Sequence, residues 1–180
     1  VDSPAKVVVR PRAQPARFEL ELAASATTGV RGPADAVGAQ VGMRLPLIRT
    51  LSLHAALGAR VGEIPSAQAS TRTALGALGL GGLASPADSP VQLGLRADFI
   101  PSWFEVTRPL ANDSEVESRS RWMFGGAALL EGGYRFSPGF GVCAGVGAEV
   151  MLSPTDVYAQ GQLAAKLPTF RVVGELGLRA

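Results

Sequence analysis

The chain has 180 residues, a length typical of one domain, and a formal net charge of +2, which is too small to indicate nucleic-acid binding. Charged residues make up only 18% of the chain, against about 25% in ordinary soluble domains, so much of the surface is expected to lie away from water. No run of 18 or more apolar residues occurs, which excludes a transmembrane helix and leaves strands as the way to cross a bilayer.

The first residues differ in composition from the rest of the chain. Residues 1–16 hold Pro4, Pro11 and Pro15 between basic residues, a pattern typical of an extended tether or linker. The chain begins at Val1 with neither an initiator methionine nor an apolar signal core, so we expect a mature form or a fragment from which an export signal was removed. We therefore predict a proline-rich tether over 1–16 and one folded domain over 17–180.

From residue 17 onward, apolar side chains recur at every second position. Because successive side chains of a strand point to opposite faces, each such run predicts a strand with one apolar face. The clearest run extends from Phe140 to Leu152 and has a small opposite face that carries Glu149. A bulge is expected at Gly81-Gly82. The nine runs are Arg17–Thr27, Ala36–Leu45, Leu51–Val61, Ser70–Leu83, Val91–Ile100, Arg121–Phe136, Phe140–Leu152, Val157–Leu167 and Phe170–Ala180.

A single-chain bacterial barrel needs an even number of strands, so one run must have another role. We assign Val157–Leu167 to a loop hairpin outside the membrane, because it has the most polar face and Pro168 ends it. Eight strands remain, and their connections alternate in length, as in membrane barrels. The longer connections are near 28–35, 62–69, 101–120 and 153–169, and the shorter ones are at 46–50, 84–90 and 137–139.

With this strand count and its closing Phe170–Ala180 strand, the chain resembles the small eight-stranded outer-membrane barrels of the OmpA/OmpX type. The resemblance implies an all-β fold, an antiparallel up-and-down transmembrane β-barrel in the outer membrane of a Gram-negative cell envelope. It also implies outer-membrane lipid as the surroundings. Many members end in an aromatic residue, whereas this chain ends Leu178-Arg179-Ala180, so we expect either a chain that continues or a different assembly signal.

The faces opposite the apolar ones carry six acids and six arginines. An eight-stranded barrel has room inside for little more than its own side chains, so this balanced set predicts an ion-pair network that plugs the lumen; a conducting pore or proton path is the alternative. Arg179 should meet Glu19 or Glu21 where the barrel closes, and Arg44 should approach the same acids. The set is Glu19, Glu21, Arg44, Arg60, Arg96, Asp98, Glu131, Arg135, Glu149, Arg171, Glu175 and Arg179.

Candidate reactive groups are few. His54 is the only histidine and shares a face with Ser52, so a hydrolase built on these two and a carboxylate is one hypothesis, against a hydrogen-bonded lumen histidine. Cys143 is expected to be a small buried filler, with a reactive thiol as the alternative. The sequence contains no metal-ligand spacing and no phosphate loop, so we expect no catalytic residue, metal or cofactor.

Four aromatic residues are predicted to lie at the membrane interfaces: Trp103, Phe104, Trp122 and Tyr134. Alternatively, Trp103-Phe104 in the expected 101–120 loop forms a knob that binds another envelope protein. The acidic residues Asp113, Glu115 and Glu117 are expected to form a solvated loop tip.

Three functions compete at this point. The leading one is a non-enzymatic structural or anchoring component of the envelope, with the 101–120 loop or the N-terminal tether as contacts to other envelope proteins. The second is a lipid-modifying outer-membrane hydrolase that uses Ser52 and His54. The third is a soluble barrel that binds a hydrophobic ligand, in which the apolar faces would point inward.

Overall fold

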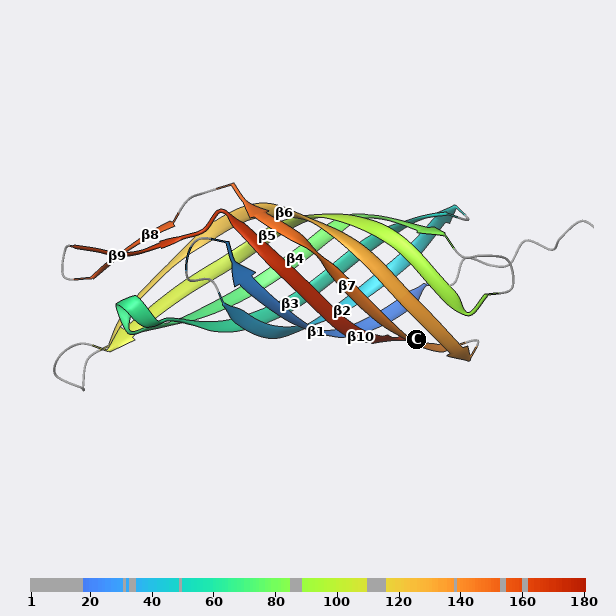
Figure 1. Ribbon diagram of the computed structural model, residues 1–180, viewed down its shortest axis with the longest axis horizontal. Coiled ribbons are helices and arrows are strands. Elements are labelled where there is room, and N and C mark those ends of the chain that lie inside the picture. Colours follow the sequence, from blue (N-terminus) through green and yellow to red (C-terminus); the bar gives the residue numbers. More distant parts are fainter. Residues whose placement is uncertain are drawn as a thin grey trace, which may run out of the picture.

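The protein is a closed antiparallel barrel of eight strands (Figure 1). The computed structural model describes residues 18–30, 32, 35–48, 50–84, 89–109, 116–137, 139–152, 155–159 and 162–180; the predicted tether over 1–16 lies outside them. Within these ranges no helix is long and apolar enough to span a membrane. The barrel strands are β1 (Glu19–Gly29), β2 (Ala36–Ile48), β3 (Leu51–Ile64), β4 (Ala69–Ala84), β5 (Val91–Pro109), β6 (Val116–Ser137), β7 (Phe140–Met151) and β10 (Phe170–Arg179).

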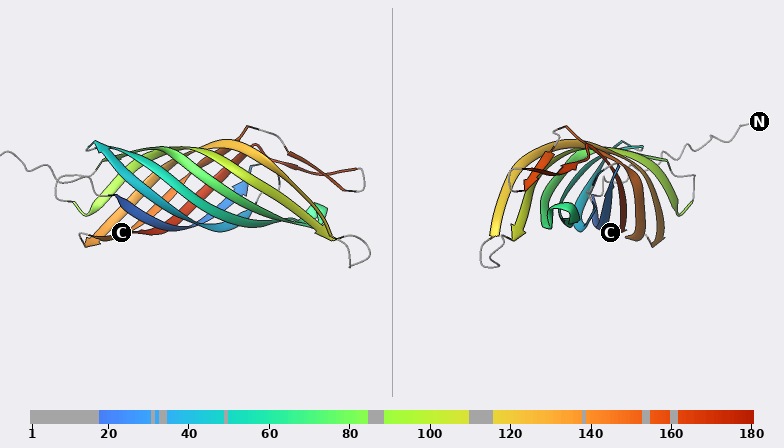
Figure 2. Two further views of the ribbon diagram at one scale, coloured as in Figure 1. Left: turned by 180° about the vertical axis from the view of Figure 1, so that it is seen from behind. Right: turned by 60° about the vertical axis from the view of Figure 1, so that its left-hand side comes forward.

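The first and last strands close the barrel. β1 and β10 pair along nine residues, and the backbones of Leu20 and Ala180 exchange hydrogen bonds of 2.8 and 2.9 Å. The short connections β2–β3, β4–β5 and β6–β7 lie at the same end as the start of β1 and the end of β10, which we call the termini end (Figure 2). The opposite, loop end carries the connections β1–β2, β3–β4, β5–β6 and β7–β10. At the termini end β2–β3 and β6–β7 are joined by two residues and β4–β5 by six, whereas at the loop end the connections have six, four, six and eighteen residues. The longest connection, β7–β10, thus lies at the loop end, as in outer-membrane barrels.

The run that was set aside as a loop hairpin is indeed one. Strands β8 (Thr155–Ala159) and β9 (Gln162–Leu167) pair only with each other and form a separate two-stranded sheet between β7 and β10. They lie at the loop end, as does the short helix η1 (Pro65–Ala67) in the β3–β4 connection, and the hairpin contacts this helix (Figure 1). The prediction of eight barrel strands is therefore confirmed.

The predicted loop over 101–120 is wrong over most of its length. β5 continues to Pro109 and β6 begins at Val116, and these two strands pair along all of this extension. The predicted strand ends at Ile100, although the alternation continues past it. The fold tolerates Pro101 because the β4–β5 register passes from Leu75↔Ser102 to Leu78↔Phe99, so that the residue without an N–H sits in a gap of the ladder.

The predicted bulge at Gly81-Gly82 is also wrong. The β3–β4 register is continuous from Leu51↔Gly82 to Ile64↔Ala69. Register shifts occur instead in β2, between Pro46 and Ile48, and in β6, between Arg135 and Ser137, each next to a short connection. Gly81 faces inward and leaves space there for Arg44, since an added Cβ would lie 2.9 Å from its Nη1, whereas Gly82 faces outward.

The apolar faces point outward around the whole barrel. Leu57, Leu95, Leu130 and Leu176, on four different strands, are each more than half exposed, whereas the charged faces are buried inside. This arrangement overturns the hypothesis of a soluble barrel with an apolar interior. A closed barrel with an apolar exterior satisfies every backbone hydrogen bond and leaves only hydrocarbon-compatible side chains outside, as a bilayer requires.

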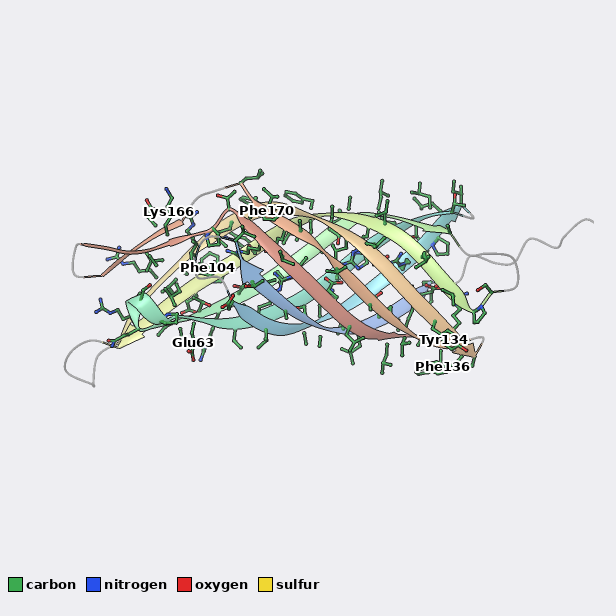
Figure 3. All side chains as sticks on the ribbon, viewed as in Figure 1. Glu63, Phe104, Tyr134, Phe136, Lys166 and Phe170 are labelled. Atoms are coloured by element: carbon green, nitrogen blue, oxygen red, sulfur yellow. The ribbon has the colours of Figure 1, made fainter. Side chains whose placement is uncertain are left out.

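Aromatic residues mark the two borders of this apolar band. Trp122, 59% exposed, packs edge to face on Trp103 at a centroid distance of 5.4 Å toward the loop end. Tyr134 and Phe136 point outward at the termini end (Figure 3). Trp122 and Tyr134 are twelve positions apart on β6, which corresponds to about 30 Å along the axis at about 3.3 Å per residue and a tilt of about 40°. The band thus has the height of a membrane hydrocarbon core.

Replacing Gly147 with alanine should destabilise the barrel. An added Cβ would lie 2.0 Å from the Ala128 carbonyl oxygen on the neighbouring strand, so the β6 and β7 backbones would have to separate. We expect a loss of about 1–3 kcal/mol in the free energy of unfolding, measured by urea unfolding in detergent with tryptophan fluorescence. Gly174→Ala is the matched control, because its Cβ meets no atom within 4 Å. Equal stability of the two variants would contradict this account.

Candidate functional site in the barrel lumen

Arg96 on β5 occupies the centre of a charged cluster inside the barrel. It donates from Nε to Asp98, from Nη1 to Glu131 and from Nη2 to Glu175, each at 2.7 Å. The three acids come from β5, β6 and β10, so one guanidinium connects strands that lie on different sides of the lumen. The charge is deeply buried, since only 3% of Arg96 is exposed. Buried charges of this kind persist because each has a partner.

Two further side chains complete this central cluster. Arg44 on β2 lies opposite Glu19 in the β1–β2 ladder, but its guanidinium reaches across the lumen to both carboxylate oxygens of Glu131, at 2.7 and 2.9 Å. Arg44 thus lies opposite an acid of β1, as expected, but its ion pair is with Glu131 on β6. His54 Nδ1 lies 3.0 Å from Asp98 Oδ1.

A second group of ion pairs lies toward the termini end, at the β1–β10 seam. Arg179 Nη2 is 2.9 Å from Glu21 and its Nε is 3.8 Å from Glu19. Arg135 on β6 also pairs with Glu19. The antiparallel layout of the first and last strands thus brings Arg179 to both acids that the sequence suggested.

A third group lies toward the loop end and consists of Arg60, Glu149 and Arg171. Arg60 on β3 donates to Glu149 at 2.7 Å, and Arg171 lies beside the same carboxylate at 3.5 Å. Glu149 and Arg171 are direct neighbours in the β7–β10 ladder. All twelve charged residues predicted for the lumen make at least one ion pair, although the side chain of Arg135 is 46% exposed at the termini end.

An apolar cluster, which the sequence analysis missed, covers this third group. Its buried side chains come from five barrel strands, η1 and β9: Ile64, Ala67, Ala69, Leu75, Ile100, Phe104, Met123, Met151, Ala165 and Leu167. The available signal was the continued alternation beyond Ile100, which puts Ser102 and Phe104 on the same face as Arg96 and Asp98. We call this set the apolar cap.

Phe104 corrects the predicted aromatic set. It was expected at the outer interface or in a binding knob, but it is only 5% exposed and points into the barrel (Figure 3). Its parity on β5 is opposite to that of Trp103, which faces outward. Of the acidic loop tip, Asp113 and Glu115 lie outside the described residues, and the side chain of Glu117 is not described.

Little space remains between these side chains. Two interior cavities have volumes of about 20 and 10 Å³. The larger is lined by the third group with the apolar cap, and the smaller lies between the third group (Arg60, Glu149) and the central cluster (Arg96, Asp98, Glu175). Each has room for about one water molecule.

The Ser52–His54 hypothesis does not match the geometry. Ser52 Oγ donates to the carbonyl of Gly81 at 3.2 Å, and the Nδ1 of His54 faces Asp98. Both side chains are at the termini end of β3 and buried, with exposures of 4% and 1%, whereas a lipid hydrolase needs them at the outer leaflet and open to substrate. Cys143 is buried as well, which agrees with its role as a filler.

Comparison with known proteins identifies the fold. No family model matches the chain, and no curated protein sequence matches it. Neisserial surface protein A is similar in structure, with a TM-score of 0.61 and 15% identity over 91% of this chain and 94% of that one. A major outer membrane protein from Thermus thermophilus gives a TM-score of 0.56 and 14% identity over 91% and 98%. The attachment invasion locus protein Ail of Yersinia pestis gives 0.50 and 15% over 91% and 96%.

The comparisons, the closed eight-stranded topology and the apolar exterior agree. The resemblance to small eight-stranded outer-membrane barrels is confirmed at the level of the fold. The chain is a membrane-embedded β-barrel with the fold of the small bacterial outer-membrane proteins.

Proposed function

We propose that the protein is an integral outer-membrane barrel that acts as a structural or anchoring component of the envelope, with a lumen that is plugged rather than conducting. The tether predicted over 1–16 would join the barrel at the termini end, where β1 begins. In outer-membrane barrels this end faces the periplasm, so the tether would connect the barrel to other envelope components there.

The observation that carries this proposal is the position of Arg96. Its guanidinium binds three carboxylates from three strands, and Arg44 reaches one of these acids from a fourth strand. A path for ions along the axis would have to break several of these charge-assisted hydrogen bonds, which are roughly twice as strong as neutral ones. The apolar cap would present a second barrier that ions cross only at a high desolvation cost.

Conductance measurements test the proposal. The purified full chain, reconstituted into planar lipid bilayers at neutral pH, should give no stable channel openings, whereas a general porin in the same bilayers serves as the positive control. The absence of openings follows from the cavities of about 10–20 Å³, which admit single waters but no hydrated ion. Reproducible single-channel steps from the properly folded protein would refute the plug and favour the pore alternative.

A further inference from the structure

The charges of the lumen are balanced overall but not locally. Toward the loop end, Arg60 and Arg171 share one carboxylate, Glu149, which binds one guanidinium with each oxygen. The three residues are buried: Arg60 is 6% exposed, Arg171 7% and Glu149 0%. In the central cluster acids outnumber arginines instead, since Arg96 alone contacts three acids. Among the described residues, the group at the loop end therefore carries one positive charge in excess.

Both arginines also have an unused donor. The Nε atoms of Arg60 and Arg171 are inaccessible to solvent and have no hydrogen-bond partner within the described ranges. Buried N–H groups of charged side chains nearly always have an acceptor, because leaving them unpaired is costly. The Nε atoms of Arg44 and Arg179 are equally buried and likewise have no hydrogen-bond partner among the described residues, so this feature is not special to the loop end. The positive excess is special to it, and it calls for a negatively charged partner.

The surroundings set the size of that partner. Arg60 and Arg171 line the cavity of about 20 Å³, together with the hydroxyl-bearing Thr27, Thr71 and Thr73. Such a volume suits one water molecule or one ion of similar size and excludes sulfate and phosphate. Glu63 also lines the cavity but is exposed at the rim, and no ion pair joins it to either arginine among the residues that the structure describes.

The apolar cap strengthens this electrostatic field. Leu75, Ile100, Phe104, Met151 and Leu167 form the remaining wall of the same cavity. They keep bulk water away from the arginines, so the excess charge is weakly screened and interacts strongly with a nearby anion. We infer that Arg60 and Arg171 form a binding site for a small monovalent anion of halide size, chloride under physiological conditions, which offsets the local positive charge at the loop end of the lumen.

Salt-exchange unfolding tests this site. The full chain in a nonionic detergent is unfolded thermally in mixtures of sodium chloride and sodium gluconate at constant ionic strength. The unfolding midpoint should rise with chloride and equally with bromide. At halide concentrations above the dissociation constant, each tenfold increase in concentration should raise the folding equilibrium constant about tenfold. This is the dependence expected when one ion binds only the folded state. Identical midpoints in chloride and gluconate would overturn the inference.

Matched variants separate the site from general salt effects. Arg171→Gln removes the excess charge and should abolish the chloride dependence. Arg179→Gln removes an arginine that is equally buried but does not line the cavity, and it should keep the dependence unchanged. If Arg171→Gln retains the chloride dependence, the site does not exist.

Crystals of the unmodified protein soaked in bromide give a readout that needs no variant. They should show an anomalous peak inside the cavity that Arg60 and Arg171 line. No peak there under these conditions would likewise overturn the inference.

Discussion

Replacing Arg96 with alanine should lower the free energy of unfolding by about 3–5 kcal/mol, the cost typical of removing one partner from a buried ion pair. Among the described residues, Arg96 is the only ion-pair partner of Glu175, and it also pairs with Asp98 and Glu131. Without it three carboxylates face one another across the lumen, while His54 and Arg44 remain for two of them. The measurement is equilibrium unfolding in urea after refolding into detergent or lipid vesicles.

Arg135→Ala is the matched control for this experiment. Its side chain is 46% exposed and pairs with Glu19 near the termini end, so solvent screens the interaction. We expect a loss below about 1 kcal/mol for this variant. Arg96→Lys keeps the charge but cannot present the planar fork of donors to three acids, so it should fall between the two. Arg96→Ala with no greater effect than Arg135→Ala would contradict a stabilising role for the central cluster.

Introducing arginine at Leu130 should cost about 2–4 kcal/mol in lipid vesicles, because this side chain lies near the middle of the apolar band. Leu130 is on β6 between Trp122 and Tyr134, and its cross-strand neighbours Leu95 and Val146 are also exposed and apolar. The cost arises from placing a guanidinium in hydrocarbon rather than from lost packing. Unfolding in vesicles, compared with that of the unmodified protein, measures it.

The matched control is Ser120→Arg, two positions beyond Trp122 on the same face of the same strand. There the new guanidinium would lie at the membrane border beside Glu105, which faces Ser120 in the ladder, and the expected cost is about 0–1 kcal/mol. Equal costs at Leu130 and Ser120 would mean that the apolar exterior does not lie in a bilayer at the depth proposed.

Strand faces were predictable from the sequence, whereas strand ends were not. Which face of a strand a side chain shares depends on its position in the alternation alone, so Glu149 and Arg171 fall on the faces opposite the apolar ones, and the structure has both buried. The end of β5 depends on whether a neighbouring strand can accept Pro101 without a ladder hydrogen bond, which is a property of the assembled sheet. The predicted loop contained Phe104, although its position in the alternation puts it on the same face as Arg96.

Which acid each arginine pairs with depends on how the barrel closes. Arg179 and Glu21 meet because the first and last strands of any closed up-and-down barrel are neighbours, so the sequence was enough for that pair. Arg44 pairs with Glu131 on a strand that is not its neighbour, because the shear and tilt of the barrel set which side chains face each other across the lumen. No local pattern contains that information.

By itself, the sequence determined that this chain forms strands, how many, and that each has one apolar and one polar or small face, because side-chain alternation is a local property of the backbone. It left open whether the apolar faces point out or in. Only the tertiary structure decided that question. The closed barrel turns the apolar faces outward, and its lumen holds the paired arginines and acids together with the apolar cap. The charged side chains lie inside because buried charges persist only with partners, which the lumen supplies and hydrocarbon does not. The same closure placed two arginines on one carboxylate beneath the apolar cap.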